Sequence, residues 1–302
     1  MIPGSPLVSV IMPCYEQERY VRNALRSALA QDYSPMEVIV IDDASQDHTH
    51  EIIEEVCKAY LGPHRIHYGR NSSNERIEIY NRLMREARGQ FIVHAHGDDI
   101  SFPGRVGKLV HRWLDSGASL IASDAIAIDA QGKVLGRLCN PALGVECTLE
   151  KILTHVHCPN VFGSTFGYSR EIVDRFGPFD RRRSVIRTDV ILPFRAALMK
   201  GMAFLNEPLM RCRLHNSRAA QLTYRSSRTD LASGEPNQAE RVTQLMYLFE
   251  TLLKAGDDII GEDQRNQLLR RMTPTLTTET GIFVRMRNTL IAEGWRYRWT
   301  KE

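Results

Sequence analysis

The sequence lacks three features that would set it apart at once: a large net charge, a long apolar run and a low-complexity tract. Lysine and arginine total 39 against 36 aspartates and glutamates, so the net charge of +3 gives no electrostatic ground for a nucleic-acid partner. No stretch reaches the roughly 18 apolar residues of a membrane span. Residues 1–6 also lack the basic and apolar regions of a signal peptide. We therefore expect a cytoplasmic protein, with peripheral attachment at the inner face of a membrane left open.

The cysteines lack the paired spacing of a zinc site or a disulfide framework. Six are scattered along the chain: Cys14, Cys57, Cys139, Cys147, Cys158 and Cys212. His155 and His157 precede Cys158, but no fourth ligand follows at a suitable spacing. The pattern favours free thiols in a reducing compartment.

What the chain does contain is a regular alternation of strands and helices. At 302 residues, 43% of them hydrophobic, it is long enough for one sizeable α/β domain with additional elements. Apolar runs predict strands over residues 7–12, 36–41 and 91–95. Helical spacing of apolar side chains predicts helices over residues 19–31, 49–60 and 79–87, the last capped by Gly89.

Each of these strands ends in polar side chains. The first is stopped by Pro13 and leads into Tyr15, the second ends in Asp42 and Asp43, and the third runs into Asp98 and Asp99. An Asp-rich turn is the alternative for the last pair taken alone. Because ligands of open parallel sheets bind beyond the carboxyl ends of the strands, we interpret the three ends as one binding site.

The second half of the chain alternates less regularly. We expect a helix after Arg105, strand material over residues 120–129 and 134–135, and a strand with its loop over residues 160–168. A short helix over residues 171–176, a helix with Pro193 in its first turn and final strands over 201–205 and 208–215 follow. A polar loop over 217–237 precedes helices over 238–254 and 263–272.

Four motifs together resemble the opening of a family 2 glycosyltransferase. They are VSVIMPCY (residues 8–15), VIVIDDAS (38–45), Asn81, and GQFI with HGDD (89–92 and 96–99). The resemblance covers about the first 125 residues. It implies a GT-A fold, an α/β architecture with a Rossmann-like mixed sheet flanked by helices, here followed by a C-terminal helical extension.

The resemblance also implies an activity. Family members transfer a sugar with inversion from a nucleotide-diphospho-sugar, here expected to be a UDP-sugar, to an acceptor hydroxyl, using a divalent cation. A hexosyl- or N-acetylhexosaminyltransferase of surface-glycan synthesis is expected, with a glycan or lipid-linked acceptor. Residues 1–220 would form the catalytic domain, with a nucleotide-sugar half (1–125) and an acceptor half (126–220). Residues 221–302 would form a flexible loop and a helical region.

The resemblance assigns roles to individual residues. Asp99 and His215 would bind Mn²⁺ or Mg²⁺. Relatives often carry Asp-x-Asp-Asp where this chain has His96, which is either a metal ligand or a packed side chain. Asp124 is either a sugar contact or a turn carboxylate. The nucleotide-sugar would be contacted by Pro13, Tyr15, Glu16, Asp42, Asp43, Asn81, Asp98 and Arg213.

Asp189 is the candidate catalytic base. Relatives usually carry Glu-Asp at this position, and here Thr188 replaces the Glu while Asp189 remains. Inverting transfer needs a carboxylate to take the proton of the acceptor hydroxyl as its oxygen attacks the anomeric carbon. The alternative for Asp189 is an N-cap of the helix that follows. For Asn81, the alternative is a side chain facing solvent.

Three further questions remain open at this point. The basic and aromatic residues 283–287 and 294–299 fit a membrane interface holding a lipid-linked acceptor, a dimer contact, or a tail helix packed on its own domain. A nucleotidyltransferase is a rival function, although residues 13–16 are not a Gly-rich phosphate loop. A non-catalytic nucleotide-sugar-binding protein is the other rival.

Overall fold

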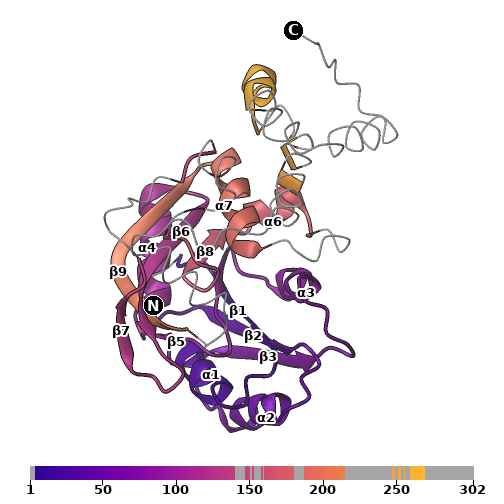
Figure 1. The fold of residues 1–302 in the computed structure, drawn as a ribbon, viewed down its shortest axis with the longest axis vertical. Coiled ribbons are helices and arrows are strands. Elements are labelled where there is room, and N and C mark those ends of the chain that lie inside the picture. The colour runs from indigo at the N-terminus through magenta and orange to yellow at the C-terminus, as the bar shows by residue number, and fades with distance from the viewer. Residues whose placement is uncertain are drawn as a thin grey trace.

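The computed structural model describes most of the first 214 residues and part of the C-terminal region. The described residues are 4–139, 147–149, 152, 158, 160–179, 187–214, 247–248, 251–252, 255 and 259–268. Within them, a mixed sheet runs through the molecule with helices on both faces (Figure 1).

The order of the strands across the sheet is β3-β2-β1-β4-β8-β6-β9-β5, and β7 pairs with β6 outside this path. Strands β3, β2, β1 and β4 are parallel to one another, and β8 is antiparallel to both β4 and β6. Their bounds are β1 Val8–Cys14, β2 Met36–Asp42, β3 Arg65–Arg70, β4 Phe91–His94, β5 Ile100–Ser101, β6 Leu120–Ile128, β7 Val134–Arg137, β8 Phe166–Ser169 and β9 Met202–Arg213.

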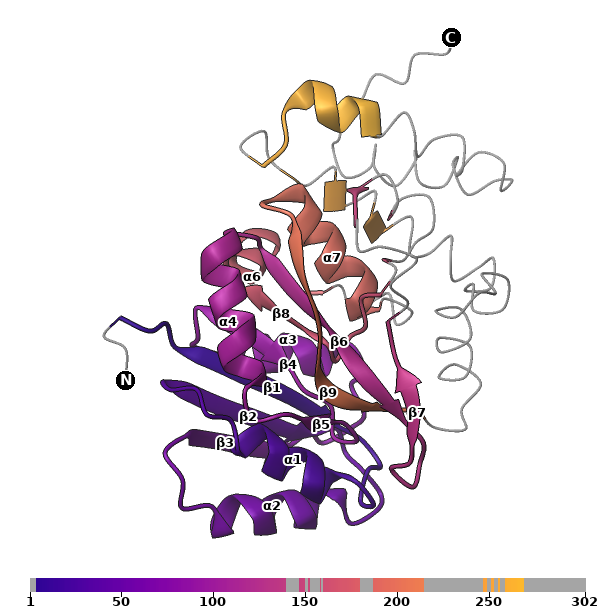
Figure 2. The same ribbon diagram turned by 90° about the vertical axis from the view of Figure 1, so that its left-hand side faces the viewer.

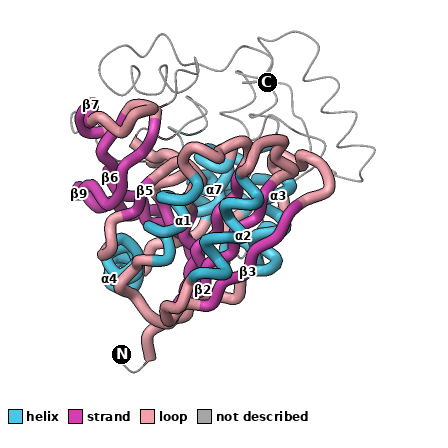
Figure 3. The backbone as a smooth tube through the Cα atoms, turned by 90° about the horizontal axis from the view of Figure 1, so that it is seen from below, coloured by secondary structure: helices cyan, strands magenta, loops and turns pink. Residues whose placement is uncertain are grey.

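Six helices have defined bounds in the described part of the chain: α1 Val21–Leu29, α2 Thr49–Ala59, α3 Glu78–Glu86, α4 Arg105–Ser116, α6 Glu171–Phe176 and α7 Thr188–Leu198. Figure 2 shows α1 and α2 below the parallel strands, with α4 beside the long strands β6 and β9. Figure 3 shows the two ends of the sheet, with β6, β7 and β9 on one side and β3 on the other.

Alternation along the strands explains how both faces of the sheet are buried. In β1, Val10 and Met12 belong to the apolar cluster formed with α1, α2 and α4, whereas Ile11 belongs to the cluster formed with α3, α6 and α7. Strand β2 repeats this pattern, because Val38 faces the first cluster and Ile39 the second. A strand that is apolar on both faces has only its ends left for polar side chains.

The predicted α/β fold is confirmed, with local corrections. Strand β6 covers Leu120–Ile128 and ends before Asp129. The two predicted last strands are one continuous strand, β9, which pairs with β6 along the length of β6, with bulges after Ser123 and Asp124. Helix α7 begins at Thr188, so Pro193 lies inside the helix and not in its first turn.

Gly89 is not a helix cap. Helix α3 ends at Glu86 with Ala87 as its C-cap, and Gly89 instead donates its backbone N–H to Ser9 Oγ at 2.8 Å. A Cβ at this position would lie 2.5 Å from the backbone nitrogen of Ser9. The glycine is therefore required by close packing against β1.

Cys147 and Cys158 are paired as a disulfide, with their Cα atoms 5.4 Å apart, which the spacing of the cysteines did not predict. Cys14, Cys57, Cys139 and Cys212 are free thiols. Among the helices that are described, none combines the length and the apolar character needed to cross a bilayer. The predicted loop over 217–237 and the basic and aromatic residues 283–287 and 294–299 lie outside the described residues.

Candidate active site

The carboxyl ends of β1, β2 and β4 meet at one edge of the sheet. Cys14 is in register with Asp42, and the N–H of Asp43 donates to the carbonyl of Cys14 at 2.8 Å. On the other side of β1, His94 is in register with Ile11. The polar residues that follow each strand are therefore neighbours, as the sequence predicted.

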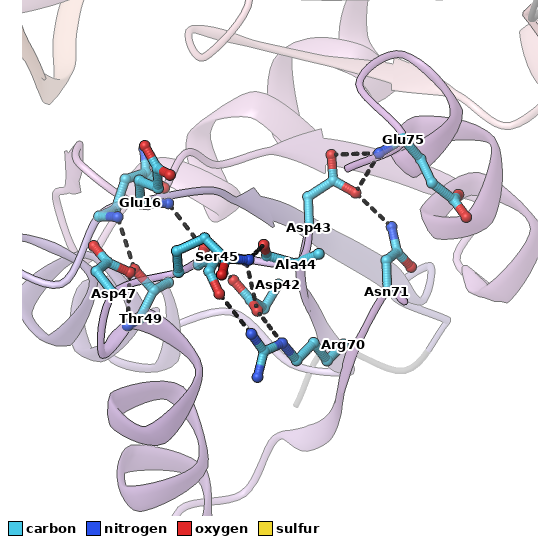
Figure 4. Close-up of polar contacts among 12 residues, drawn as sticks. Glu16, Asp42, Asp43, Ala44, Ser45, Asp47, Thr49, Arg70, Asn71 and Glu75 are labelled. Atoms are coloured by element: carbon cyan, nitrogen blue, oxygen red, sulfur yellow. Dashed lines mark hydrogen bonds and ion pairs between the residues drawn. The ribbon is translucent and has the colours of Figure 1, made fainter. Parts of the chain in front are cut away.

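Asp42 fastens the loop that follows β2 (Figure 4). Its carboxylate is fully buried, accepts hydrogen bonds from the hydroxyl and the N–H of Ser45, and pairs with Arg70 Nε at 3.1 Å. The hydroxyl of Ser45 in turn accepts the N–H of Glu16 at 2.9 Å. Asp42 thus supports the loop geometry behind the site, and its side chain has no exposed surface with which to touch a ligand.

Asp43 holds a second loop against the same edge (Figure 4). Its carboxylate accepts hydrogen bonds from Asn71 Nδ2 at 2.6 Å, from the N–H of Glu75 at 3.0 Å and from the N–H of Arg76 at 2.9 Å. Residues 71–76 therefore take their position from Asp43. A base contact by Asp43, which stays a prediction, would have to share oxygens that already accept three protein donors.

A pocket of about 330 Å³ opens between these loops. Of the residues predicted to contact the nucleotide-sugar, Pro13, Tyr15 and Asp43 line it, and Tyr15 is 42% exposed. Glu16 follows directly with a positive φ of 51° and is outside the lining. The lining residues are Pro13, Cys14, Tyr15, Gln17, Asp43, Asn74, Arg76, Ile79, Tyr80 and His96.

The segment after β4 brings three potential cation ligands to the mouth of this pocket. One ligand atom each from His96, Asp98 and Asp99 lies within 4.8 Å of the others. Gly97 is required between them, because a Cβ there would lie 2.2 Å from Gln17 Oε1 and 2.9 Å from Cys14 Sγ. The chain can pass this closely over the end of β1 only without a side chain.

The surroundings of Asp99 disfavour the ionised form of its carboxylate. It is 6% exposed and accepts the N–H of Arg213 at 2.7 Å. Burial, and next the neighbouring carboxylate of Asp98, raise the pKa of Asp99 to about 6. The neighbouring carboxylates of Asp98 and Asp99 fit Mn²⁺ or Mg²⁺, because these cations prefer oxygen ligands and would offset the repulsion between the two negative charges.

Arg213 is bound to backbone groups beside the acidic pair. Its guanidinium donates to the carbonyls of Asp98 at 3.0 Å, Asp129 at 2.8 Å and Ala130 at 3.2 Å, and lies 4.4 Å from the ring centre of Tyr20. Arg213 thus holds the end of β9 beside the acidic pair, and its contact with the donor stays a prediction. The partners of Arg213 are backbone groups of two turns far away in the sequence, and no sequence pattern predicts such contacts.

Arg105 was missed in the sequence analysis, and it is the largest fully buried side chain of the described residues. Its guanidinium donates to the carbonyls of His94 at 2.8 Å and of Ser164, and to the hydroxyl of Ser101 at 3.0 Å. Burial lowers the pKa of Arg105 to about 10, against an opposing effect of the Asp99 carboxylate. Arg105 is therefore a cation enclosed behind the acidic pair that ties β4, β5 and the loop before β8 together.

Arg105→Met is expected to lower the free energy of unfolding by about 2–4 kcal/mol, because it leaves two buried carbonyls without their donor. The matched control is Arg112→Met on the same helix, where the side chain is 39% exposed. Urea unfolding of both variants measures the difference. Equal losses for Arg105→Met and Arg112→Met would contradict the role of Arg105 given above.

Asp189 lies in the first turn of α7. Its charge acts on Tyr80, a residue that also lines the pocket. The N-cap of α7 is Arg187 and makes no side-chain cap, so the alternative of Asp189 as an N-cap is wrong. The guanidinium of Arg187 instead donates two hydrogen bonds to the Asp189 carboxylate, of 3.0 and 2.6 Å. Burial raises the pKa of Tyr80; a hydrogen bond with Thr188 opposes this, and the charges of Asp189 and Asp98 add to it. Both carboxylates are therefore within electrostatic range of one phenol.

Asn81 has a structural partner. It is 8% exposed, its Nδ2 donates to the carbonyl of Phe179 at 2.9 Å, and its Oδ1 accepts the N–H of Phe179 at 2.7 Å. The alternative of a solvent-facing side chain is therefore wrong, while the donor contact stays a prediction that would have to share this buried amide. The amide connects α3 to the turn after α6.

Asp124 is likewise structural, which settles the alternative left open. Its carboxylate has no exposed surface, accepts the N–H groups of Ala125 at 2.7 Å and Cys139 at 2.9 Å, and pairs with Arg137. His215, predicted as a metal ligand, lies outside the described residues, as do His155 and His157.

Comparison with known proteins agrees with this architecture. The model of the family described as glycosyl transferase family 2 matches residues 9–204. The chain is 39% identical over 108 residues to the putative glycosyltransferase EpsE of Bacillus subtilis, covering 35% of this chain and 38% of that protein. It is 23% identical over 212 residues to the uncharacterized glycosyltransferase alr2836 of Nostoc, covering 70% of this chain and 65% of the relative. The alignments thus span less than two thirds of either relative.

Solved structures share the fold at low identity. S. aureus TarS 1–349 in complex with UDP-GlcNAc superposes with a TM-score of 0.62 at 17% identity, covering 88% of this chain and 71% of that one. The mannosyltransferase PcManGT from Pyrobaculum calidifontis, in complex with GDP-Man and Mn²⁺, superposes with a TM-score of 0.52 at 17% identity, covering 98% and 88%. These likenesses support the GT-A fold, and the match over residues 9–204 means that the chain belongs to glycosyl transferase family 2.

Proposed function

We propose that the protein is an inverting glycosyltransferase that moves a sugar from a nucleotide-diphospho-sugar, with UDP as the nucleotide, to an acceptor hydroxyl. The observation that carries the proposal is the pocket between the ends of β1 and β2, which shares His96 with the acidic pair Asp98 and Asp99. A pocket beside clustered carboxylates suits a nucleotide whose diphosphate reaches the cluster through a cation.

The residues at the carboxyl ends of β1, β2 and β4 have different roles in donor binding. Pro13 and Tyr15 border the base and ribose, and Asp43 fixes the loop that closes the pocket from the other side. Asp98 would contact the sugar, while Asp99 and His215 would hold Mn²⁺ or Mg²⁺. The cation, when bound, offsets the charge that builds on the departing diphosphate.

Asp189 is the general base in this proposal. The acceptor oxygen forms a bond to the anomeric carbon as the bond from that carbon to the diphosphate oxygen breaks, and the electron pair leaves with the nucleoside diphosphate. The acceptor proton passes to the carboxylate of Asp189. Arg187, now paired with this carboxylate, keeps it oriented until an acceptor arrives.

Two further points belong to the proposal. Residues 1–220 form the catalytic domain, and 221–302 a loop and helical region. The acceptor is a hydroxyl of a surface glycan or of a lipid-linked intermediate. Support comes from similarity to EpsE and to the putative teichuronic acid biosynthesis glycosyltransferase TuaG of Bacillus subtilis, which is 28% identical over 136 residues, covering 43% of this chain and 53% of TuaG. S. aureus TarS has been solved with UDP-GlcNAc, which supports a UDP-N-acetylhexosamine as the first donor to test.

Thermal unfolding with candidate donors tests the binding half of the proposal. UDP-GlcNAc, UDP-glucose, UDP-galactose and GDP-mannose are each added with Mn²⁺ or with EDTA. At a donor concentration 100 times its Kd, the bound state gains about 2.7 kcal/mol, which raises the Tm by several degrees. We expect this shift for at least one UDP-sugar in Mn²⁺, and a smaller shift for the same donor in EDTA. No shift with any donor would argue against a nucleotide-sugar site.

A further inference from the structure

The inference concerns His96, which follows β4 and precedes the acidic pair Asp98 and Asp99. The side chain is 30% exposed, lines the pocket and belongs to the donor set with Asp98 and Asp99. We propose that His96 binds the cation directly through Nδ1, that Tyr80 holds its ring in place, and that the site therefore prefers Mn²⁺ to Mg²⁺. The inference rests on the proposed function, because it concerns the same cation.

The distance between His96 and Asp99 fits two ligands of one ion. His96 Nδ1 lies 3.9 Å from Asp99 Oδ2, which is too long for a hydrogen bond. Ligand atoms about 2.1 Å from a shared cation are separated by roughly 3–4.2 Å, depending on the angle between them. The gap between the imidazole and the carboxylate thus has the size that a cation requires.

The other ring nitrogen already has the partner that a ligating histidine needs. His96 Nε2 lies 3.3 Å from the hydroxyl of Tyr80. A metal-bound histidine usually gives the N–H of its second nitrogen to such an oxygen, and this contact fixes both the tautomer and the orientation of the ring. With the proton on Nε2 donated to Tyr80, the lone pair of Nδ1 points to the acidic pair.

Tyr80 is itself rigidly held. Its ring stacks on His94 with centroids 5.2 Å apart, and Thr188 at the start of α7 is among the groups that influence the pKa of its hydroxyl. Gly163 lies beside both Thr188 and His96, because a Cβ there would be in ordinary van der Waals contact with Thr188 Oγ1 at 3.4 Å and His96 Cε1 at 3.6 Å. The histidine is thereby connected to the start of α7, which carries Asp189.

The choice of nitrogen over oxygen changes which cation fits. Mg²⁺ demands oxygen ligands in near-ideal octahedral geometry. Mn²⁺ also prefers oxygen ligands, but as a first-row transition metal it binds a nitrogen donor more readily than Mg²⁺ does. An imidazole in the donor set therefore weakens Mg²⁺ more than Mn²⁺, whereas the lack of a third carboxylate weakens both ions.

Electron paramagnetic resonance of bound Mn²⁺ tests the inference without an activity assay. The full-length protein is loaded with Mn²⁺ and UDP, and ¹⁴N hyperfine coupling from a ligating imidazole is recorded by spin-echo modulation. The background is His215→Ala, so that the second candidate histidine contributes nothing. We expect the coupling in His215→Ala and its loss when His96→Asp is added. Absence of ¹⁴N coupling in His215→Ala would overturn the inference even if His96→Asp failed to fold.

Cation competition provides the second readout. Mg²⁺ is titrated against bound Mn²⁺, and free Mn²⁺ is measured by its solution signal. We expect His96→Asp to reduce the preference for Mn²⁺ about tenfold, and Tyr80→Phe to weaken Mn²⁺ affinity about tenfold with the ¹⁴N coupling retained. The control is His111→Asp at an exposed position of α4, which should match wild type.

The outcomes also separate this inference from the proposed function. If Mn²⁺ strengthens UDP binding but His96→Asp leaves the cation preference unchanged, His96 is a packed side chain and only the inference fails. If Mn²⁺ does not strengthen UDP binding by any of these proteins, the proposed function fails, and the inference with it.

Discussion

Asp189→Asn should reduce sugar transfer about 10³-fold, within the 10²–10⁴-fold range of general-base catalysis, and leave donor affinity nearly unchanged. Asparagine keeps the size and one oxygen of the side chain, but it cannot accept the proton of the acceptor hydroxyl. The measurement is kcat for transfer from the UDP-sugar identified by thermal unfolding, together with the Kd of UDP in Mn²⁺. A loss in kcat without a change in Kd assigns the carboxylate to the chemical step.

Asp174→Asn is the matched control for this experiment. Asp174 is an exposed aspartate of α6 that also pairs with an arginine, Arg170, at 3.5 Å. Its substitution removes the same charge from a neighbouring helix, so kcat should stay within a factor of two of wild type. If Asp189→Asn transfers sugar as fast as Asp174→Asn does, the base lies elsewhere. If neither wild type nor variant transfers sugar while UDP still binds, the chain is a nucleotide-sugar-binding protein.

The strand ends could be located from the sequence because the pattern that predicts them is local. Val10 and Ile11 face opposite apolar clusters, and so do Val38 and Ile39, which makes each strand a continuous apolar run with a polar end. The convergence of Asp43 and Asp98 at one edge then follows from parallel pairing alone. The short strand β5 was missed because two residues carry no period that a pattern can detect.

Two side chains predicted to contact the donor, Asn81 and Arg213, have protein partners that the sequence did not reveal, namely backbone groups far away in the chain. Asn81 binds Phe179 across 98 positions, and Arg213 binds the carbonyl of Asp98 across 115. Such a contact depends on which loop packs on which helix, and residue type gives no indication of it. Arg105 was missed because a charged residue on an amphipathic helix is normally expected in solvent.

Asp99→Asn should weaken UDP binding in Mn²⁺ and at the same time stabilise the protein without metal. In EDTA, UDP should bind wild type and variant alike, because neither then holds a cation. In Mn²⁺, only wild type should gain affinity, about 10-fold or more, since the variant has lost an anionic ligand of the ion. Titration calorimetry of UDP in the two buffers measures both effects. Equal affinities of the two proteins in Mn²⁺ would remove Asp99 from the cation site.

The gain in stability follows from the pKa of Asp99. Burial and the Asp98 carboxylate raise this pKa to about 6, from about 3.9 in an unfolded chain. Between these values the folded protein binds more protons than the unfolded one, so its free energy of unfolding falls as the pH rises. The cost of ionising Asp99 in the folded state is therefore about 3 kcal/mol at pH 7.5 and about 1 kcal/mol at pH 4.5. Asparagine does not ionise, so the Asp99→Asn variant avoids this cost.

Urea unfolding in EDTA at the two pH values measures this difference. Asp99→Asn should exceed wild type in unfolding free energy by more at pH 7.5 than at pH 4.5, by roughly 2 kcal/mol. Asp115→Asn, at a site on α4 where the side chain is 63% exposed, should show no such dependence on pH. A pH-independent difference for Asp99→Asn would mean that the residue carries no buried charge. The predicted pattern, lower stability in exchange for cation binding, is what a carboxylate placed for function and not for folding should produce.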